Sequence, residues 1–319
     1  MFLMCAITKT VLSNAEDVAD EMLRKHGRSF YWARHFLGKE TARRSTLLYS
    51  FCRFLDDVAD GDLPGGLELL NLIRAQIDAG PIEGTSDVIP EVQIFMRLSA
   101  EVGIPSAAAL DLIDGLIFDQ GPVAIENEAQ LIVYAYRVAG TVGLMMSPIL
   151  GRKDPHADAF AIDLGIGMQL SNIARDVAED AVLGRRYLPS DWCHDVSAQE
   201  IRGALVERVP EYRCTVSRAT VKTVDLAEVY YKSGIAGLRY LPLRNNIAIG
   251  IAAFVYRAIG RRLKRKGCKW WQGREVVGPS GKLLASTQSL GRLVSPPRFN
   301  NLHNKKLHAP LQSLESFNV

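Results

Sequence analysis

The segment at residues 41–60, TARRSTLLYSFCRFLDDVAD, predicts the class of fold. Its apolar residues recur every three or four positions, which is the spacing of an α-helix with one buried face. Residues 61–66, with one proline and three glycines, then end the helix. We therefore expect a helix over 41–59 that carries acidic residues at its end. The apolar positions are Leu47, Leu48, Phe51, Phe54 and Leu55.

Two acidic clusters stand more than a hundred residues apart in the chain. Asp56 and Asp60 form the first, and Asn172, Asp176 and Asp180 form the second. Residues four positions apart share one face of a helix. Acids one turn apart on an apolar helix repel one another and lose solvation, unless a cation or solvent compensates. Mg²⁺ accepts a few carboxylates and completes its shell with water and phosphate oxygens. The alternative is two solvated helix faces with ordinary surface acids.

Arginines accompany both clusters. Arg53 precedes Asp56 by three residues, Arg175 lies inside the second cluster, and the pair Arg185 and Arg186 follows it. A guanidinium binds phosphate oxygens through a planar fork. Acids for a metal and arginines for phosphate together predict a site for a metal-bound diphosphate.

Helical periodicity continues through the rest of the chain, and no segment of any length alternates as a strand. No Pro/Gly/Ser-rich linker divides the 319 residues, so we expect one large all-α domain over residues 1–293. Residues 294–319 are polar and aperiodic, and we predict a disordered tail there. Further helices are expected at 15–23, 29–37, 67–77, 88–100, 106–119, 128–150, 157–183, 198–209, 211–232 and 243–263.

Composition limits the environment of the protein. The chain is 48% hydrophobic, which suffices for a core, and its five cysteines show no paired spacing. An odd count argues against a disulfide framework and favours a reducing cytoplasm. The N-terminal residues lack the pattern of a signal peptide, and the apolar run at 247–256 is too short to span a bilayer. We expect a protein that is soluble or associated with a membrane surface.

Eight lysines and arginines against one acid stand between Arg257 and Glu275, together with Trp270 and Trp271. Basic residues beside tryptophans suggest contact with anionic lipid headgroups. The alternative is a solvated helix end whose cations favour the helix dipole. A nucleic-acid interface is less favoured, because no recognised binding motif accompanies the patch. The six histidines are scattered and receive no role.

Several blocks resemble one known family. They are HGRSFY at 26–31, YSFCRFLDD at 49–57, VAGTVG at 138–143 after Tyr134, and QLSNIARD at 169–176 followed by YLP at 187–189. In order and spacing these blocks resemble the phytoene/squalene synthases, most of all the bacterial phytoene synthases, from about Gly27 to about Leu293. The resemblance implies a single-domain isoprenoid synthase bundle around a central cavity. Gly140 and Gly143 would break a helix beside the prenyl chain, or else allow close helix packing.

The resemblance also implies roles for individual residues. Metal ligands would be Asp56, Asp60, Asn172, Asp176 and Asp180, with Asp57 as outer support. Arg53, Arg175 and Arg186 would hold diphosphate, and Tyr187 would hydrogen-bond it. Asp56, Asp60, Asp176 and Tyr187 would be the catalytic group. The cavity would be shaped by Ser29, Phe30, Tyr49, Tyr134 and Gln169. An acid near Asp119 occurs in the family, although a capping or solvated role is equally open here.

The reaction implied is head-to-head condensation of two geranylgeranyl diphosphates to phytoene through a cyclopropyl (prephytoene) diphosphate, the first committed step of carotenoid biosynthesis. It would need Mg²⁺, with Mn²⁺ as a substitute, and no NADPH. The nearest alternative joins two farnesyl diphosphates to dehydrosqualene, presqualene diphosphate or, with NADPH, squalene. The absence of a Gly-x-Gly-x-x-Gly fingerprint only mildly disfavours the reductive branch. A remoter alternative is a non-catalytic lipid-binding or assembly scaffold. We expect a cytoplasmic, peripherally membrane-associated enzyme, with a downstream desaturase as a partner and no nucleic acid.

Overall fold

The protein is built from helices, as the periodicity predicts. The computed structural model describes Tyr31, Arg34 and residues 36–80, 88–207, 209–294 and 302–317. In chain order the helices are α3 Lys39–Ala59, α4 Gly66–Ala79, α5 Pro90–Val102, α6 Ser106–Phe118, α7 Glu128–Ala135, α8 Thr141–Ile149, α9 Ala157–Arg175, α10 Val177–Val182, α11 Ser190–Cys193, α12 Ala198–Glu207, α13 Pro210–Gly237, α14 Leu243–Arg265 and α15 Pro279–Val294. Shorter helical turns are η1 Tyr136–Gly140, η2 Leu238–Tyr240, η3 Trp270–Gln272 and η4 Lys305–Ser313.

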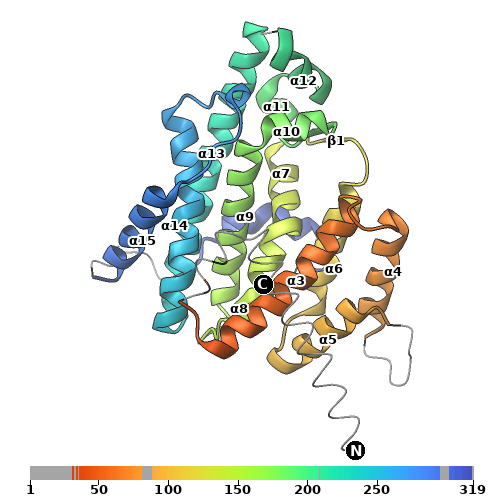
Figure 1. Ribbon diagram of the computed structural model, residues 1–319, viewed down its shortest axis with the longest axis vertical. Helices are drawn as coiled ribbons and strands as arrows, with labels where there is room; N and C mark the ends of the chain where they lie inside the picture. Colours follow the sequence, from red (N-terminus) through yellow and green to blue (C-terminus); the bar gives the residue numbers. More distant parts are fainter. Residues whose placement is uncertain are drawn as a thin grey trace, which may run out of the picture.

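Helix α9 is the central element. It packs against α7, α8, α13 and α14, which surround it in Figure 1. Its sequence from Ala157 to Gly167 is almost wholly apolar or small, and the buried residues of α9 lie on all of its faces. A helix that is apolar all round is stable only inside a protein, so α9 forms the axis of the bundle.

Close packing of the central helices depends on glycine. A Cβ at Gly143 on α8 would lie 2.2 Å from the Ala161 carbonyl oxygen of α9, and a Cβ at Gly165 would lie 2.2 Å from the Ala139 carbonyl oxygen. The chain between α7 and α8 is a single π-helical turn, η1, which shifts the helix register locally. The close-packing interpretation of Gly143 is therefore confirmed. A role for this break beside a ligand stays a prediction.

Two short strands were not expected from the sequence. β1 Val123–Ala124 pairs in parallel with β2 Arg185–Arg186, with Val123 opposite Arg185. Two residues cannot show a period of two convincingly, which explains why the sequence pattern did not indicate them. The pairing fixes the loop after α10 against the loop after α6.

The C-terminal segment differs from the prediction of a disordered tail. α15 extends to Val294, and residues 302–317 lie against the bundle, with η4 packed on α7. Figure 1 shows this last blue segment running behind α9 and α7. Tyr230 of α13 donates a hydrogen bond of 2.8 Å to the Leu307 carbonyl, and Leu311 is fully buried. The segment is ordered by tertiary contacts, which an aperiodic local sequence does not reveal.

One helical stretch, Glu128–Ile149, is long and apolar enough to cross a membrane, with a mean hydropathy of 1.2 over its best window in the described residues. Half of that window is buried inside the protein. Tyr136 within it donates a hydrogen bond of 2.9 Å to Asp111 of α6. These contacts identify the stretch as a core helix.

Cys52, Cys193, Cys214 and Cys268 are free thiols.

We predict that Gly143→Ala lowers the free energy of unfolding by about 1–3 kcal/mol, because the added methyl overlaps the α9 backbone and the helices must separate. Urea denaturation followed by circular dichroism measures the change. Gly203→Ala on α12 is the matched control, since a Cβ at this position would have nothing within 4 Å and alanine favours helix by about 0.5–1 kcal/mol. Equal stability of Gly143→Ala and the natural protein would contradict the packing argument.

Candidate active site

The first acidic cluster closes α3, as the sequence indicates. Asp56 lies on the last turn and is half-buried, whereas Asp60 is the exposed C-cap. Burial raises the pKa of Asp56 to about 7; Arg53 opposes this effect, and the Asp60 and Asp57 carboxylates add to it. Arg53 forms an ion pair with Asp57 one turn along the helix. A cation beside this carboxyl would favour its ionised form.

The second cluster lies across a helix break. The sequence predicts one helix over 157–183, but α9 ends at Arg175, and Asp176 adopts φ −103° and ψ 17° before α10 begins. The backbone N–H of Asp176 still donates to the Asn172 carbonyl at 2.9 Å, and the backbone N–H of Asp180 donates to the Asp176 carbonyl at 2.8 Å. One-turn spacing is therefore kept through the bend, so the expected spacing of the three ligands holds although the single straight helix is wrong.

Two guanidinium groups bind Asp176. Arg175 donates to Asp176 Oδ1 and Oδ2 at 2.7 and 2.5 Å, and Arg274 donates to the same oxygens at 2.7 and 2.8 Å. Arg274 comes from the loop before α15, far away in the sequence. Tyr256 of α14 lies near both arginines. Burial raises the pKa of its hydroxyl, and the charges of Arg175 and Arg274 oppose this effect. The planar guanidinium groups of Arg175 and Arg274, each bidentate to Asp176, therefore lie beside the acidic site.

Asp119 joins the two clusters. Tyr134 donates a hydrogen bond of 2.7 Å to one of its oxygens, and Tyr187 donates one of 2.9 Å to the other. The two rings stack at 4.6 Å. Burial raises the pKa of Asp119 although both hydroxyls and Arg185 oppose it, and its charge in turn helps to raise the pKa of Asp56. Asp119 is the C-cap residue of α6, as one sequence-based alternative had it, but it is buried and therefore not a solvated acid.

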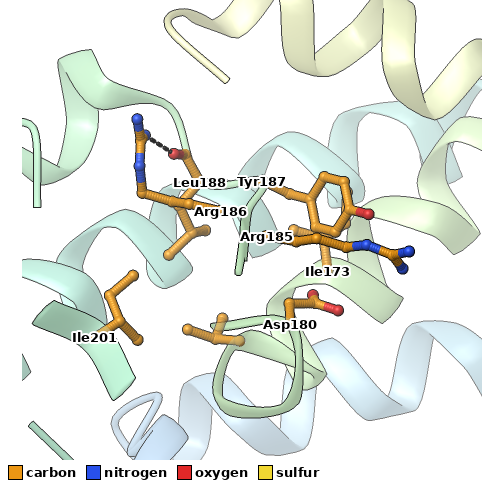
Figure 2. Close-up of a pocket in the computed structure, with 8 residues that line it drawn as sticks. Ile173, Asp180, Arg185, Arg186, Tyr187, Leu188 and Ile201 are labelled. Carbon is orange, nitrogen blue, oxygen red and sulfur yellow. Dashed lines mark hydrogen bonds between the residues drawn. The ribbon is translucent and has the colours of Figure 1, made fainter. Parts of the chain in front are cut away.

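Arg185, and not Arg186, faces the acids. Arg185 lies 3.9 Å from Asp60 Oδ1 and donates to the Asp119 carbonyl at 3.1 Å. Figure 2 shows its guanidinium beside the Tyr187 hydroxyl and Asp180, with the Arg186 side chain pointing the opposite way. The Arg186 side chain donates to the Ile125 and Leu188 carbonyls and to the Ser190 hydroxyl. The Arg186 side chain, predicted to hold diphosphate, thus points away from the acids, and Arg185 lies beside them, because consecutive strand residues point to opposite sides.

The remaining predicted residues have mixed outcomes. Gln169 accepts a bond of 3.3 Å from Asn172 Nδ2, so its side chain supports a proposed ligand. Tyr49 lies on α3 near Arg53 and Tyr256, and burial raises its pKa to about 12. Ser29 and Phe30 lie outside the described residues. The sequence interpretation missed Arg274 in this site, although the density of arginines between Arg257 and Glu275 was a signal that some would have anionic partners.

The donor set fits a hard divalent cation. The side-chain oxygen Oδ1 of Asn172 is buried and has no hydrogen-bond partner in the described part of the chain, as expected of an atom reserved for a ligand. Burial, with the Asp176 carboxylate beside it, raises the pKa of Asp180 to about 8. Carboxylate and amide oxygens are the ligands that Mg²⁺ prefers. Asp56, Asp60, Asn172, Asp176 and Asp180 would hold such ions.

The chain is similar to known proteins over most of its length. The family model "Squalene/phytoene synthase" matches residues 23–280. A 15-cis-phytoene synthase of Enterobacter agglomerans is 33% identical over 84% of this chain and 92% of its own length. A phytoene synthase of Thermus thermophilus is 36% identical over 77% of this chain and 82% of its own. A crystal structure of a dehydrosqualene synthase with a ligand superposes with a TM-score of 0.77 at 25% identity, covering 89% of this chain and 98% of that one.

We predict that neighbouring arginines respond differently to substitution. Arg185→Gln should weaken Mg²⁺-dependent binding of inorganic diphosphate by about tenfold with little loss of stability, because it removes a cation beside the acids. Arg186→Gln should instead lower stability by about 1–3 kcal/mol, since buried carbonyls lose their donor. Calorimetric titration and urea denaturation measure the two effects. The reverse pattern would restore Arg186 as the phosphate ligand.

Proposed function

Because the chain belongs to the squalene/phytoene synthase family, we propose that it condenses two molecules of geranylgeranyl diphosphate head to head to give phytoene. The family carries out head-to-head condensation of prenyl diphosphates and uses a divalent metal with them, so the chain is a prenyltransferase of this kind. The choice of the C20 substrate is supported by relatives named phytoene synthase, which are 32–36% identical over most of the chain. No NADPH is needed in this scheme.

The arrangement around Asp176 is the observation that carries the proposal. An acid that would bind metal already lies within a fork of two arginines. Diphosphate oxygens compete with the Asp176 carboxylate for these guanidinium groups. Both anions accept hydrogen bonds from the same N–H donors. Arrival of the substrate would release the Asp176 carboxylate toward the cation that accompanies the diphosphate. The site thus assembles fully only with substrate and metal together.

The protein's own groups have distinct tasks in the reaction. Arg53, Arg175, Arg185 and Arg274 hold the diphosphates, and Tyr187 is fixed by Asp119 so that its hydroxyl stays near them. Bound Mg²⁺ stabilises the negative charge that grows on the departing diphosphate. The apolar helices around α9 exclude water from the allylic cation that remains. The second prenyl double bond attacks this cation, and loss of a proton then closes the ring of the cyclopropyl diphosphate. Departure of its diphosphate, rearrangement of the cation and loss of a second proton complete the sequence.

The nearest alternative is a C30 product from two farnesyl diphosphates. It is favoured by the structural similarity to a dehydrosqualene synthase. A non-catalytic scaffold is the remoter alternative, and it offers no reason to keep both acidic clusters and their arginines in a partly buried setting.

The test is incubation of the purified protein with Mg²⁺ and geranylgeranyl or farnesyl diphosphate, with and without NADPH, followed by hydrocarbon analysis. We expect phytoene without NADPH. Asp56→Ala and Asp176→Ala should each lower turnover by about a thousandfold or more with unchanged circular dichroism, because each removes a metal ligand. Asp78→Ala, an exposed acid on α4, is the matched control and should be fully active.

A C30 hydrocarbon would change the substrate and keep the chemistry. No release of diphosphate from either substrate would favour the scaffold. Normal turnover in Asp56→Ala or Asp176→Ala would reject the metal assignment.

We also propose peripheral association with the cytoplasmic membrane surface. The face of the protein that would contact the membrane differs from the one expected from the sequence. Trp270 is only 2% exposed, and the Arg213 guanidinium covers the Trp271 ring at 4.9 Å. Trp270 is therefore not available for the predicted contact with lipid, whereas Trp271 is partly exposed. A groove of about 1080 Å³ between α14 and α15 is lined by basic residues, and Leu283 and Leu284 of α15 are 66% and 60% exposed beside it.

We expect that the protein sediments with vesicles that contain anionic lipid, and that Leu283→Ser with Leu284→Ser reduces the bound fraction severalfold by removing exposed apolar area. Val206→Ser, at an exposed apolar residue of α12, is the control. Equal sedimentation of both variants would reject this face. A membrane surface would also pass the insoluble product to a downstream desaturase.

A further inference from the structure

Three metal-binding side chains meet away from the acidic clusters. Asp163 of α9 lies beside His303 and His308 of the C-terminal segment, and one ligand atom from each lies within 4.8 Å of the others. His303 Nε2 is 2.7 Å from one Asp163 oxygen, and His308 Nε2 is 2.8 Å from the other. The histidines stand 140 and 145 residues after the acid in the chain. Only the fold brings them together.

The setting is deeply buried. Asp163 is 0% exposed and His308 is 4% exposed. The rings of Phe160 and Phe317 meet His303 and His308 edge to face at 5.2 and 5.3 Å. Aromatic walls of this kind keep water away and leave the polar atoms dependent on one another.

The charge at this position needs a counter-ion. Within the described residues no lysine or arginine pairs with Asp163, whose ion-pair partners are the two histidines. A buried carboxylate without a lysine or arginine partner is costly, and a divalent cation held together with the two imidazoles is one way to compensate it.

From this geometry we propose that Asp163, His303 and His308 form a structural site for Zn²⁺ or a similar transition metal, which fastens the C-terminal segment to the central helix. Two imidazoles and one carboxylate are ligands that Zn²⁺ accepts and that Mg²⁺ does not favour. Bonds of about 2.1 Å place neighbouring ligand atoms about 3.4 Å apart in a tetrahedron, so the present separations would widen by about 0.6 Å. Side-chain rotation supplies such a shift.

The site is distinct from the proposed active site. Asp163 precedes Asn172 by nine residues on α9, which corresponds to about 13 Å along the helix axis. Asp163 instead belongs with the other contacts that hold residues 302–317 against the bundle. Ser316 donates to Asp111 at 2.6 Å, and Tyr230 donates to the Leu307 carbonyl. A metal bond would add a crosslink to a segment whose own sequence has little tendency to fold.

The test uses the full-length protein, stripped with EDTA and dialysed against Zn²⁺, with metal content measured by mass spectrometry. We expect one tightly bound Zn²⁺ per chain and a higher Tm with Zn²⁺ than with EDTA. The double variant His303→Gln with His308→Gln should lose both effects. His156→Gln is the matched control, because His156 also pairs with an aspartate, Asp154, but on the surface. It should behave as the natural protein does.

A second measurement protects the test if the double variant does not fold. X-ray absorption at the zinc edge of the natural protein should show nitrogen and oxygen ligands with imidazole scattering. Sulfur ligands, absence of bound Zn²⁺ in the natural protein, or an unchanged Zn²⁺ content in a folded double variant would each overturn the proposal. The three residues would then be a hydrogen-bonded anchor without metal. None of these measurements depends on catalytic activity.

Discussion

Burial of several carboxylates at one end of an apolar bundle is the constraint on which the rest of this structure depends. Burial raises the pKa of Asp56, Asp119 and Asp180, and the neighbouring acids raise it further. Such a group is stable only if hydrogen bonds, arginines or metal ions compensate it. The stacked tyrosines, the arginine fork and the unpartnered Asn172 oxygen are all found around these acids. The hydroxyl and guanidinium groups supply this compensation, and the Asn172 oxygen, which has no hydrogen-bond partner in the described residues, can still accept a donor or a cation.

The central helix connects this end of the protein to the rest. α9 carries Asn172 and Arg175 at one end and Asp163 in its middle, and glycines let neighbouring helices approach it closely. Its position is therefore held by backbone contact, with little freedom to adjust. Asn172, the proposed ligand that lies on this rigid axis, keeps its position better than a loop residue would. Asp176 lies at the bend after α9, and it is also the acid that two arginines hold.

The basic stretch between Arg257 and Glu275 illustrates how composition and structure differ. Arg257 and Arg261 both pair with Glu228, and Arg262 and Lys266 both pair with Glu275. Arg274 belongs to the proposed active site. Much of the apparent surface charge is thus neutralised within the protein, and this holds for most of the basic residues that line the groove beside α15.

The sequence by itself determined the all-α class, most helix positions and the acidic residues of the site, because helical periodicity and one-turn spacing are local properties of the chain. It could not distinguish Arg185 from Arg186, since that choice depends on the pairing of β2 with β1. It also could not place Arg274 on Asp176 or predict that residues 302–317 fold against the bundle. These features rest on contacts between residues that are far apart in the chain, as with Arg274 and Asp176 or His303 and Asp163. Local patterns carry no information about such distant partners, so only the tertiary structure decided them.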